Sequence, residues 1–478
     1  MGTLRKSRKE DELLADLREG RKLGGRRAAL LVWLLSLPTI LAELSSVAME
    51  YIDAAMVGRI GAQGAASIGL VASTTWLFWG MLRASSTGFA VQVAQRIGAR
   101  RDGEARAILL QGFVANVGVS VAIGAIGAAI SGALPHWLGG DASLARDASR
   151  YFLVYMLGMP VIQLPGFASR ILQAAGDMRR AGVLNTAMCA LDVVFNYIFI
   201  FPSRSLSIAG ARIIMPGFGM GVTGAAVGTV VAEAIAGALM AWALLVRHPT
   251  LRMRRGEPLR FNRAVLAEAA RIGLPVAFES AVMTGAMVMS TAIVAPLGAV
   301  ALAANSFAII AESICYMPGY GIASAAMTLV GQAVGAGRRA MARRFAWICT
   351  GMGAASLGAT AALLFVLAPW TMAILSPDAE VASLGAAALR IGIIAEPLFA
   401  ASMVASGALR GAGDSLVPSL LNFASMWGVR IPLMTLLTPR MGLRGAWLSM
   451  ALELTVRCCL MLMRLSSPRW TRRHTHKQ

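Results

Sequence analysis

The chain contains one apolar unit twice, and the second copy follows the first at a constant distance of 237 residues over most of its length. The pair Leu37-Pro38, for example, returns as Leu274-Pro275. Further on the distance falls to 221, because Gly221 corresponds to Gly442, so the first copy carries 16 extra residues near 202–218. Duplicated apolar units are typical of secondary transporters, in which the substrate path lies between the copies.

The composition is that of a membrane protein. Hydrophobic residues make up 57% of the chain and charged residues only 14%, whereas soluble domains carry roughly 25% charge. The net charge of +20 does not indicate a nucleic-acid partner, because the basic residues form short clusters between apolar stretches and no continuous basic face. The lipid bilayer is therefore the expected surrounding, and nucleic acid is not an expected partner.

Apolar stretches of the roughly 20 residues needed to cross a bilayer predict an all-α membrane protein with twelve transmembrane helices in two pseudo-symmetric six-helix bundles. The approximate spans are 28–57, 64–95, 106–133, 149–175, 181–201, 221–246, 265–295, 299–333, 344–374, 383–409, 416–438 and 443–466. The expected domains are a cytoplasmic amino-terminal segment (1–27), an N-lobe of helices 1–6 (28–246), a cytoplasmic linker (247–264), a C-lobe of helices 7–12 (265–466) and a cytoplasmic tail (467–478).

Arginines gather in alternate loops, which orients the chain. With twelve spans, the basic clusters all lie on one side; they include Arg26, Arg101, Arg180, Arg254, Arg339 and Arg472. The positive-inside rule places that side, and both termini, in the cytoplasm. We expect a multi-pass protein of the inner (plasma) membrane whose two copies insert in the same direction, related by a pseudo-twofold axis along the membrane normal.

No catalytic motif is visible. The chain lacks HExxH, CxxC and a GxxxxGK[ST] phosphate loop, so we expect no enzyme activity, no cofactor and no metal centre. A membrane-embedded transferase would need a cluster of acids or histidines at a membrane surface, and none is visible. The five cysteines lie within apolar spans without paired spacing, which favours packing over disulfides. An ion gradient is the expected energy source.

Acidic residues within apolar spans are the candidate functional groups, because a carboxylate in hydrocarbon is costly. Asp192 and Asn196 are spaced i, i+4 and share one helix face, where they either bind an ion or only hydrogen-bond to a neighbouring helix. Glu453 lies four residues before Arg457, so an intrahelical ion pair is expected. Glu312 and Glu233 have no obvious partner in the sequence.

Four runs of residues resemble the multidrug and toxic compound extrusion (MATE) transporters. These runs are Asp53-Ala-Ala-Met-Val-Gly-Arg-Ile-Gly61, the stretch 317–335, Gly407-Ala-Leu-Arg-Gly-Ala-Gly-Asp414 and Trp427-Gly-Val-Arg-Ile-Pro432. The resemblance covers nearly the whole chain, from about residue 28 to residue 466. It implies two six-helix bundles around a V-shaped cavity, and export of amphipathic, often cationic organic compounds in exchange for H⁺ or Na⁺.

The resemblance also implies ion-coupling residues. In the N-lobe these are Asp53, Asp192, Asn196 and Thr229, with Asp and Asn exchanged relative to the better-known pattern of the family. In the C-lobe, one branch of the family has a glutamate where this chain has Met283. The second-lobe candidates are therefore two acids that lie about one turn from that branch's positions, Glu279 and Glu396.

Arg83 in the second span is a possible charge partner of Asp53 or another acid, or else faces an aqueous cavity or a cluster of backbone carbonyls. Pro38 and Pro275 occupy equivalent positions and are candidate hinges for rocking of one lobe against the other. The alternative function is a flippase for a lipid-linked precursor, which would need a basic central cavity; only Arg83 and Arg430 are well placed for it. We expect a monomer.

Overall fold

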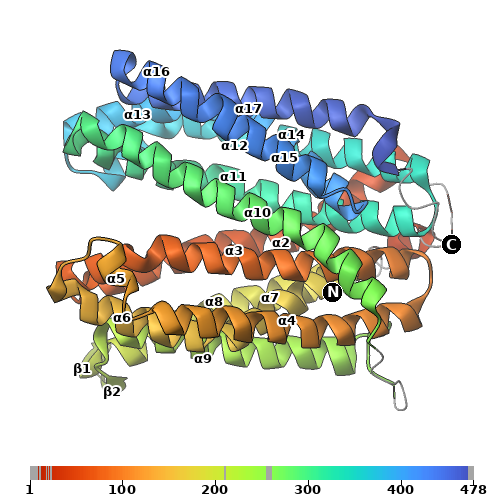
Figure 1. Ribbon diagram of the computed structural model, residues 1–478, viewed down its shortest axis with the longest axis horizontal. Helices are drawn as coiled ribbons and strands as arrows, with labels where there is room; N and C mark the ends of the chain where they lie inside the picture. The colour runs from red at the N-terminus through yellow and green to blue at the C-terminus, as the bar shows by residue number, and fades with distance from the viewer. Residues whose placement is uncertain are drawn as a thin grey trace.

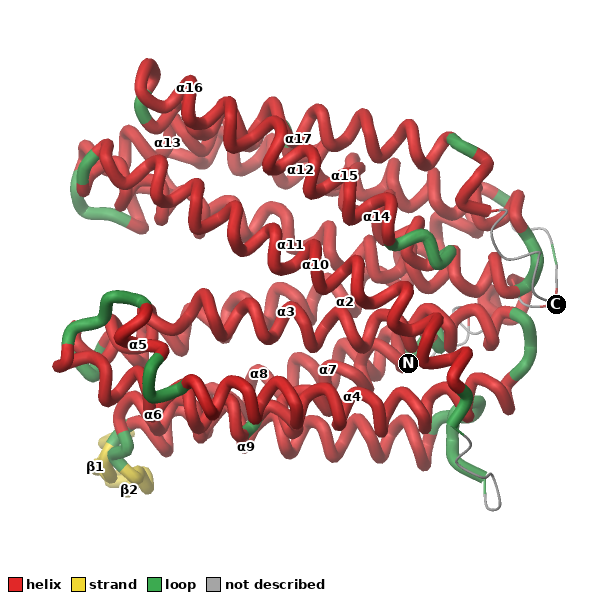
Figure 2. Tube along the Cα trace, viewed as in Figure 1, coloured by secondary structure: helices red, strands yellow, loops and turns green. Residues whose placement is uncertain are grey.

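The computed structural model describes residues 9, 12–17, 19, 21, 24–208, 211–254 and 261–471. Parts of the predicted amino-terminal segment, linker and tail lie outside these described residues. The chain folds into two helical layers that lie side by side, with both termini at the same end of the molecule (Figures 1 and 2).

The N-lobe contains eight helices and one hairpin among the described residues. The helices are α2 (Gly25–Gly58), α3 (Ala62–Gly98), α4 (Asp102–Ile130), α5 (Leu134–Trp137), α6 (Ala142–Leu157), α7 (Met159–Ala174), α8 (Met178–Ile200) and α9 (Gly221–Trp242), which continues as a π-helical turn, Ala243–Arg247. The hairpin strands are β1 (Pro202–Ile208) and β2 (Ala211–Phe218).

The C-lobe repeats this arrangement without the hairpin. Its helices are α10 (Arg263–Val294), α11 (Ala299–Gly335), α12 (Arg339–Leu375), α13 (Ala379–Ile393), α14 (Glu396–Gly411), α15 (Leu416–Ser425), α16 (Ile431–Met441) and α17 (Leu443–Ser466). Short 3₁₀ turns at Ala295–Leu297 and Pro468–Thr471 and a π-helical turn at Met426–Arg430 complete it.

The prediction of twelve spans in two six-helix bundles is confirmed, with one correction. Ten helices are long and apolar enough to cross a membrane, and the pairs α6–α7 and α13–α14 complete the twelve if each bent pair is one span. The sequence predicted one span over each of 149–175 and 383–409, long enough to tilt or kink, and the structure forms each from two helices that bend by 51° at the break. Proline stands at the start of α7 and of α14, as Pro160 and Pro397, where it cannot continue the preceding hydrogen-bond ladder.

The extra residues of the first copy form the antiparallel hairpin β1–β2. It extends from the end of the N-lobe that lies away from both termini (Figure 1). The comparison of the two copies located this insertion, but a difference in length alone does not predict which secondary structure the added residues adopt. The fold is otherwise helical, as predicted.

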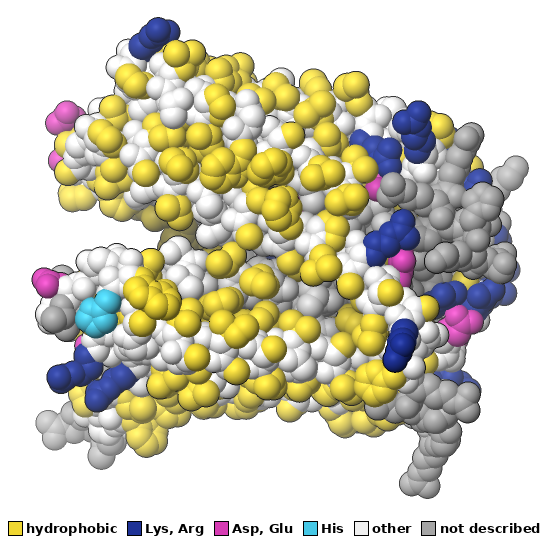
Figure 3. Space-filling model, in the orientation of Figure 1, with side chains coloured by type: hydrophobic (Ala, Val, Ile, Leu, Met, Phe, Trp, Pro, Cys, Tyr) yellow, Lys and Arg dark blue, Asp and Glu magenta, His cyan; other side chains and the backbone are white. Residues whose placement is uncertain are grey.

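The two lobes separate at one end and meet at the other. Figure 3 shows a cleft between them at the end that carries the hairpin. Toward the termini, α3 and α11 cross so closely that a Cβ at Gly98 would meet the carbonyl of Gln332, and one at Gly335 would meet that of Gln95. Because these four residues are related by the duplication, the closed end is a pseudo-twofold contact that only glycine permits at the crossing.

Helix α2 belongs to both lobes. Its first half buries Leu31, Val32 and Leu35 in a core shared with α11, α12 and α14 of the C-lobe. Its second half packs against α8 of the N-lobe. Pro38 lies between the two halves, and next to it the Thr39 hydroxyl donates to the carbonyl of Gly321 on α11 at 3.2 Å.

Candidate functional site

Asn196 joins two acids in the N-lobe. Its side-chain Nδ2 donates to Oδ2 of Asp192 on the same helix, α8, at 2.9 Å. The same nitrogen donates to Oδ1 of Asp53 on α2 at 3.0 Å. The i, i+4 spacing on α8 places both side chains on one face. Helix α2 brings the second carboxylate to them, an arrangement that the resemblance implied.

Two oxygen atoms of this group have no partner. Oδ1 of Asp192 and Oδ1 of Asn196 are buried and accept no hydrogen bond from any described residue. Asp192 is fully buried, and Asn196 is 1% exposed. An unpaired buried acceptor is costly, so this pocket fits a proton on the carboxyl group or a small hard cation between the oxygens.

Helix α9 forms the next wall. Thr229 interacts with the Asp192 carboxyl group, as expected from the resemblance. Gly228 precedes it, and a Cβ at this position would collide with Oδ1 of Asn196. Nothing in the sequence singles out Gly228 except its position directly before Thr229, a predicted site residue. Glu233 follows Thr229 by one turn and adds a further acid to the same region.

Helix α6 contributes two residues that the sequence analysis did not identify. Tyr151 and Tyr155 stack with ring centroids 6.1 Å apart. Tyr151 lies near Asp53 and Asp192, and Tyr155 lies near Glu233. Their i, i+4 spacing shows that they share a face, but nothing local to α6 indicates that this face meets α2 and α8.

Glu279, the first second-lobe candidate, belongs to a complete hydrogen-bond network. Arg410 of α14 donates to both of its oxygens at 2.6 Å. Ser419 and Asn422 of α15 donate at 2.6 and 2.7 Å. All three partners lie more than 130 residues away along the chain. A carboxylate saturated in this way joins α10 to α14 and α15.

Glu396, the other second-lobe candidate, is fully buried, and neither of its side-chain oxygens has a hydrogen-bond partner among the described residues. The structure places it beside Glu312 of α11, not beside Glu279. Glu312, for which the sequence offered no partner, therefore lies next to Glu396. Glu453 accepts a hydrogen bond from Nε of Arg457 at 2.7 Å, in the expected intrahelical ion pair, and another from Nε of Arg430 at 3.1 Å.

Arg83 lies apart from Asp53. Its guanidinium carbon lies 4.7 Å from the centre of the Trp79 ring. In the part of the chain that the structure describes, this guanidinium makes no ion pair or hydrogen bond.

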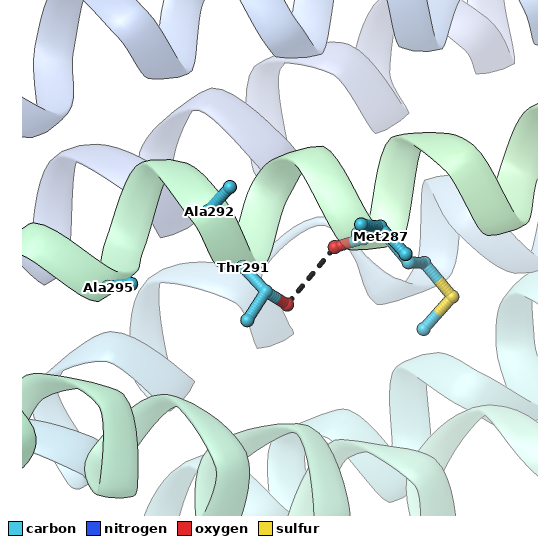
Figure 4. Close-up of a pocket in the computed structure, with 5 residues that line it drawn as sticks. Met287, Thr291, Ala292 and Ala295 are labelled. Atoms are coloured by element: carbon cyan, nitrogen blue, oxygen red, sulfur yellow. Dashed lines mark hydrogen bonds between the residues drawn. The ribbon is translucent and has the colours of Figure 1, made fainter. Parts of the chain in front are cut away.

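A shallow groove of ≈ 430 Å³ runs along α10 and is lined by Met287, Val288, Thr291, Ala292 and Ala295. Figure 4 shows that the Thr291 hydroxyl points back to the carbonyl of Met287, to which it donates at 3.1 Å. The groove therefore presents apolar atoms and has no group that would orient a ligand.

Within the described ranges, no group of three or more His, Cys, Asp or Glu residues is arranged to hold a metal ion. The five cysteines are free thiols, and four of them are buried. The pocket around Asp192 offers two carboxylates and the neutral oxygen of Asn196.

Comparisons with known proteins agree with this architecture. The MatE family matches residues 38–198 and 275–436, one match in each copy of the repeat. The chain is 25% identical to a probable multidrug resistance protein NorM of Thermotoga maritima, over 92% of each chain. It is 28% identical to multidrug resistance protein NorM of Burkholderia vietnamiensis, over 90% of this chain and 92% of the relative. A solved structure titled as MATE in complex with MaL6 superposes with a TM-score of 0.85 at 20% identity, covering 92% of this chain and 97% of that one.

Proposed function

Since this chain belongs to the MATE family of membrane transporters, we propose that it is a secondary active antiporter that exports amphipathic, cationic organic compounds in exchange for H⁺ or Na⁺. The curated relatives named as multidrug resistance proteins support this cargo class. The protein then lies in the inner (plasma) membrane with both termini in the cytoplasm, and the cleft in Figure 3 opens outward. It works as a monomer and needs no cofactor.

The observation that carries the ion-coupling proposal is the pair of unpartnered oxygens at Asp192 and Asn196. An ion that enters from the outer side satisfies both oxygens and offsets the repulsion between the Asp53 and Asp192 carboxylates. Thr229 contributes a further neutral oxygen. Bound ion and bound cargo stabilise opposite orientations of the two lobes, so each drives out the other without any covalent step.

The two acids of the second lobe have different roles in this proposal. Glu279 is held by Arg410 and by two neutral donors, so we assign it a structural role. Glu396, with Glu312 beside it, remains the second-lobe candidate for ion binding.

The flippase alternative is less well supported. A lipid phosphate would need several free basic groups. Of the two arginines that the sequence offered, Arg430 is paired with Glu453, which leaves only Arg83 without an ion pair among the described residues. We therefore retain antiport as the function.

The test is efflux of ethidium from everted vesicles under separately imposed pH and Na⁺ gradients. Asp53→Asn and Asp192→Asn should leave the protein in the membrane but abolish gradient-driven transport. The matched control is Asp378→Asn, which alters an aspartate that caps α13, and Asn caps a helix equally well. Wild-type rates in both site variants would place the coupling elsewhere, with Glu396 as the next position to change.

A further inference from the structure

One face of α3 leads from the closed end of the molecule into the cleft. Where the lobes meet, Gly98 and Ala94 lie against α11, and Val91 packs with Met327 of that helix. Helical spacing places Thr87 and Arg83 on the same face, one and two turns further toward the cleft. Arg83 therefore lies where α3 and α11 have begun to separate.

The duplication places Tyr320 opposite Arg83, because the two residues are 237 positions apart. Tyr320 is 36% exposed and interacts electrostatically with Arg83 and with Glu43 of α2. Equivalent positions on α3 and α11 face each other across the pseudo-twofold axis, as the reciprocal glycine contacts at the closed end show. Arg83 and Tyr320 thus form the floor of the cleft.

A second arginine reaches this floor from α7. Gln173 of α7 touches α11, since its side-chain and backbone oxygens accept from Ser324 at 2.5 Å and from Thr328 at 3.0 Å. Arg170 lies one turn before Gln173 and so is one turn further into the cleft. It is close enough to Arg83 and to Glu43 to interact with both.

The guanidinium groups of Arg83 and Arg170 have no ion pair or hydrogen bond with any residue that the structure describes. Four other arginines in the spans each form an ion pair with an acid; they are Arg410, Arg430, Arg457 and Arg464. An arginine at membrane depth needs an anion or water. Two acids lie near this floor, Glu43 and Glu279. Because Glu279 already pairs with Arg410, the two unpaired arginines leave an excess positive charge there.

The shape of the site suits a planar anion attached to an aromatic body. Arg83 lies over the face of Trp79, which fixes the plane of the guanidinium and leaves its N–H edges free. Trp76 packs edge-to-face on Trp79, with ring centroids 6.1 Å apart, and is 54% exposed. A guanidinium edge binds a carboxylate through two parallel hydrogen bonds.

We propose that Arg83 and Arg170 form a carboxylate-binding site at the floor of the cleft, and that the preferred cargo is an amphipathic zwitterion. The carboxylate binds between the two guanidinium groups, the cationic group lies toward Glu43, and the organic body packs on the tryptophans of α3. This inference rests on the proposed function only in taking the cleft as the cargo path. It narrows the cargo from organic cations in general to those that also carry a carboxylate.

Tetramethylrhodamine and its methyl ester are matched probes, because they share one cationic dye and differ in a free carboxylate. Fluorescence anisotropy with the purified full-length protein should show tighter binding of the acid than of the ester. Arg83→Gln and Arg170→Gln should each weaken binding of the acid by about 10- to 100-fold, the range for loss of a charge-assisted hydrogen bond. Binding of the ester should change little.

Arg390→Gln is the matched control. Arg390 also lies over an aromatic ring, that of Phe365 at 5.4 Å, but its helix, α13, packs against α11, α12 and α17 of its own lobe. This variant should bind both probes like the wild type. Since Arg83 and Arg170 have no ion pair or hydrogen bond to lose among the described residues, their variants should also elute as folded protein and melt close to the wild-type temperature.

Equal affinity of the wild type for the acid and the ester would overturn the proposal. An equal loss of affinity for both probes in the arginine variants would also overturn it. Short-chain phosphatidic acid tests whether the site binds a lipid phosphate. If it displaces the carboxylate probe at far lower concentrations than an unlabelled dye that carries a benzoate group, the site belongs to a lipid phosphate and the proposal is overturned. Failure of the antiporter proposal gives a different result, because gradient-driven efflux of ethidium would then be absent whatever the order of probe affinities.

Discussion

Replacing Glu279 and Glu396 by glutamine should affect stability very differently, although both are buried acids of the same lobe. Glu279 accepts four hydrogen bonds, two of them from Arg410 at 2.6 Å. In Glu279→Gln one oxygen becomes an NH₂ group that faces donors, and Arg410 loses its counter-charge. Breaking a buried pair in this way costs about 3 kcal/mol or more, and the 21% exposure of the Arg410 side chain places the loss at the lower end.

Glu396→Gln should leave stability nearly unchanged, because Glu396 lacks the hydrogen bonds that Glu279 has. Neither oxygen of Glu396 has a hydrogen-bond partner among the described residues, so a neutral amide of the same shape removes nothing that stabilises the fold. For a lobe of about 200 residues, a loss of 3 kcal/mol lowers the melting temperature by roughly 6–12 °C. We expect Glu279→Gln to show a decrease in this range and Glu396→Gln to stay within about 2 °C of the wild type, within the spread of uncoupled substitutions.

The assay is thermal unfolding of the purified protein in one detergent, followed by tryptophan fluorescence. Glu279→Asp is a useful third variant, because it keeps the charge but shortens the side chain, and its melting temperature should lie between the other two. Equal melting temperatures for Glu279→Gln and Glu396→Gln would refute the assignment of Glu279 to a structural network.

Three other predictions follow from the geometry. Gly228→Ala should reduce gradient-driven transport, since its Cβ collides with Asn196, whereas Gly118→Ala, which has open space around it, should transport normally; equal rates would contradict the close approach of α9 to the site. A cysteine at Asp141 should react with an impermeant thiol reagent added to intact cells and one at Arg338 should not; the reverse pattern would invert the orientation. A crosslink between the α2–α3 turn and the α10–α11 turn should stop transport while the cytoplasmic side still binds cargo, and undiminished transport by fully crosslinked protein would disprove rocking of the lobes.

Local patterns predicted the parts of this molecule that depend on local geometry. Hydrophobic length predicted the spans, and the i, i+4 spacing of Asp192 and Asn196 predicted their shared face. The 51° bends were not predicted, because a proline in an apolar stretch is compatible with a kinked helix as well as a broken one. The proximity of Asp53 to Asp192 came from the family resemblance, not from spacing.

Contacts between distant segments explain the remaining differences. Arg410 lies 131 residues from Glu279, and no periodicity connects them. Glu312 had no obvious partner in the sequence for the same reason, since Glu396 lies 84 residues away. The duplication does not help here, because the positions equivalent to these two acids in the first copy are Thr75 and Met159. The two copies share a scaffold, but Glu312 and Glu396 have no acidic counterpart in the first copy.

Helix α2 is embedded in both halves of the molecule, which limits how the lobes can move. Leu31 and Leu35 are anchored in the C-lobe core, while Asp53, further along the same rod, is tied to Asn196 in the N-lobe. A rigid rod fixed in two bodies cannot follow both when they rotate apart. Reorientation of the lobes must therefore bend α2 between its two anchors, where Pro38 already interrupts the ladder, or pull Asp53 away from Asn196. Occupancy of the ion pocket and the angle between the lobes are therefore mechanically coupled through α2.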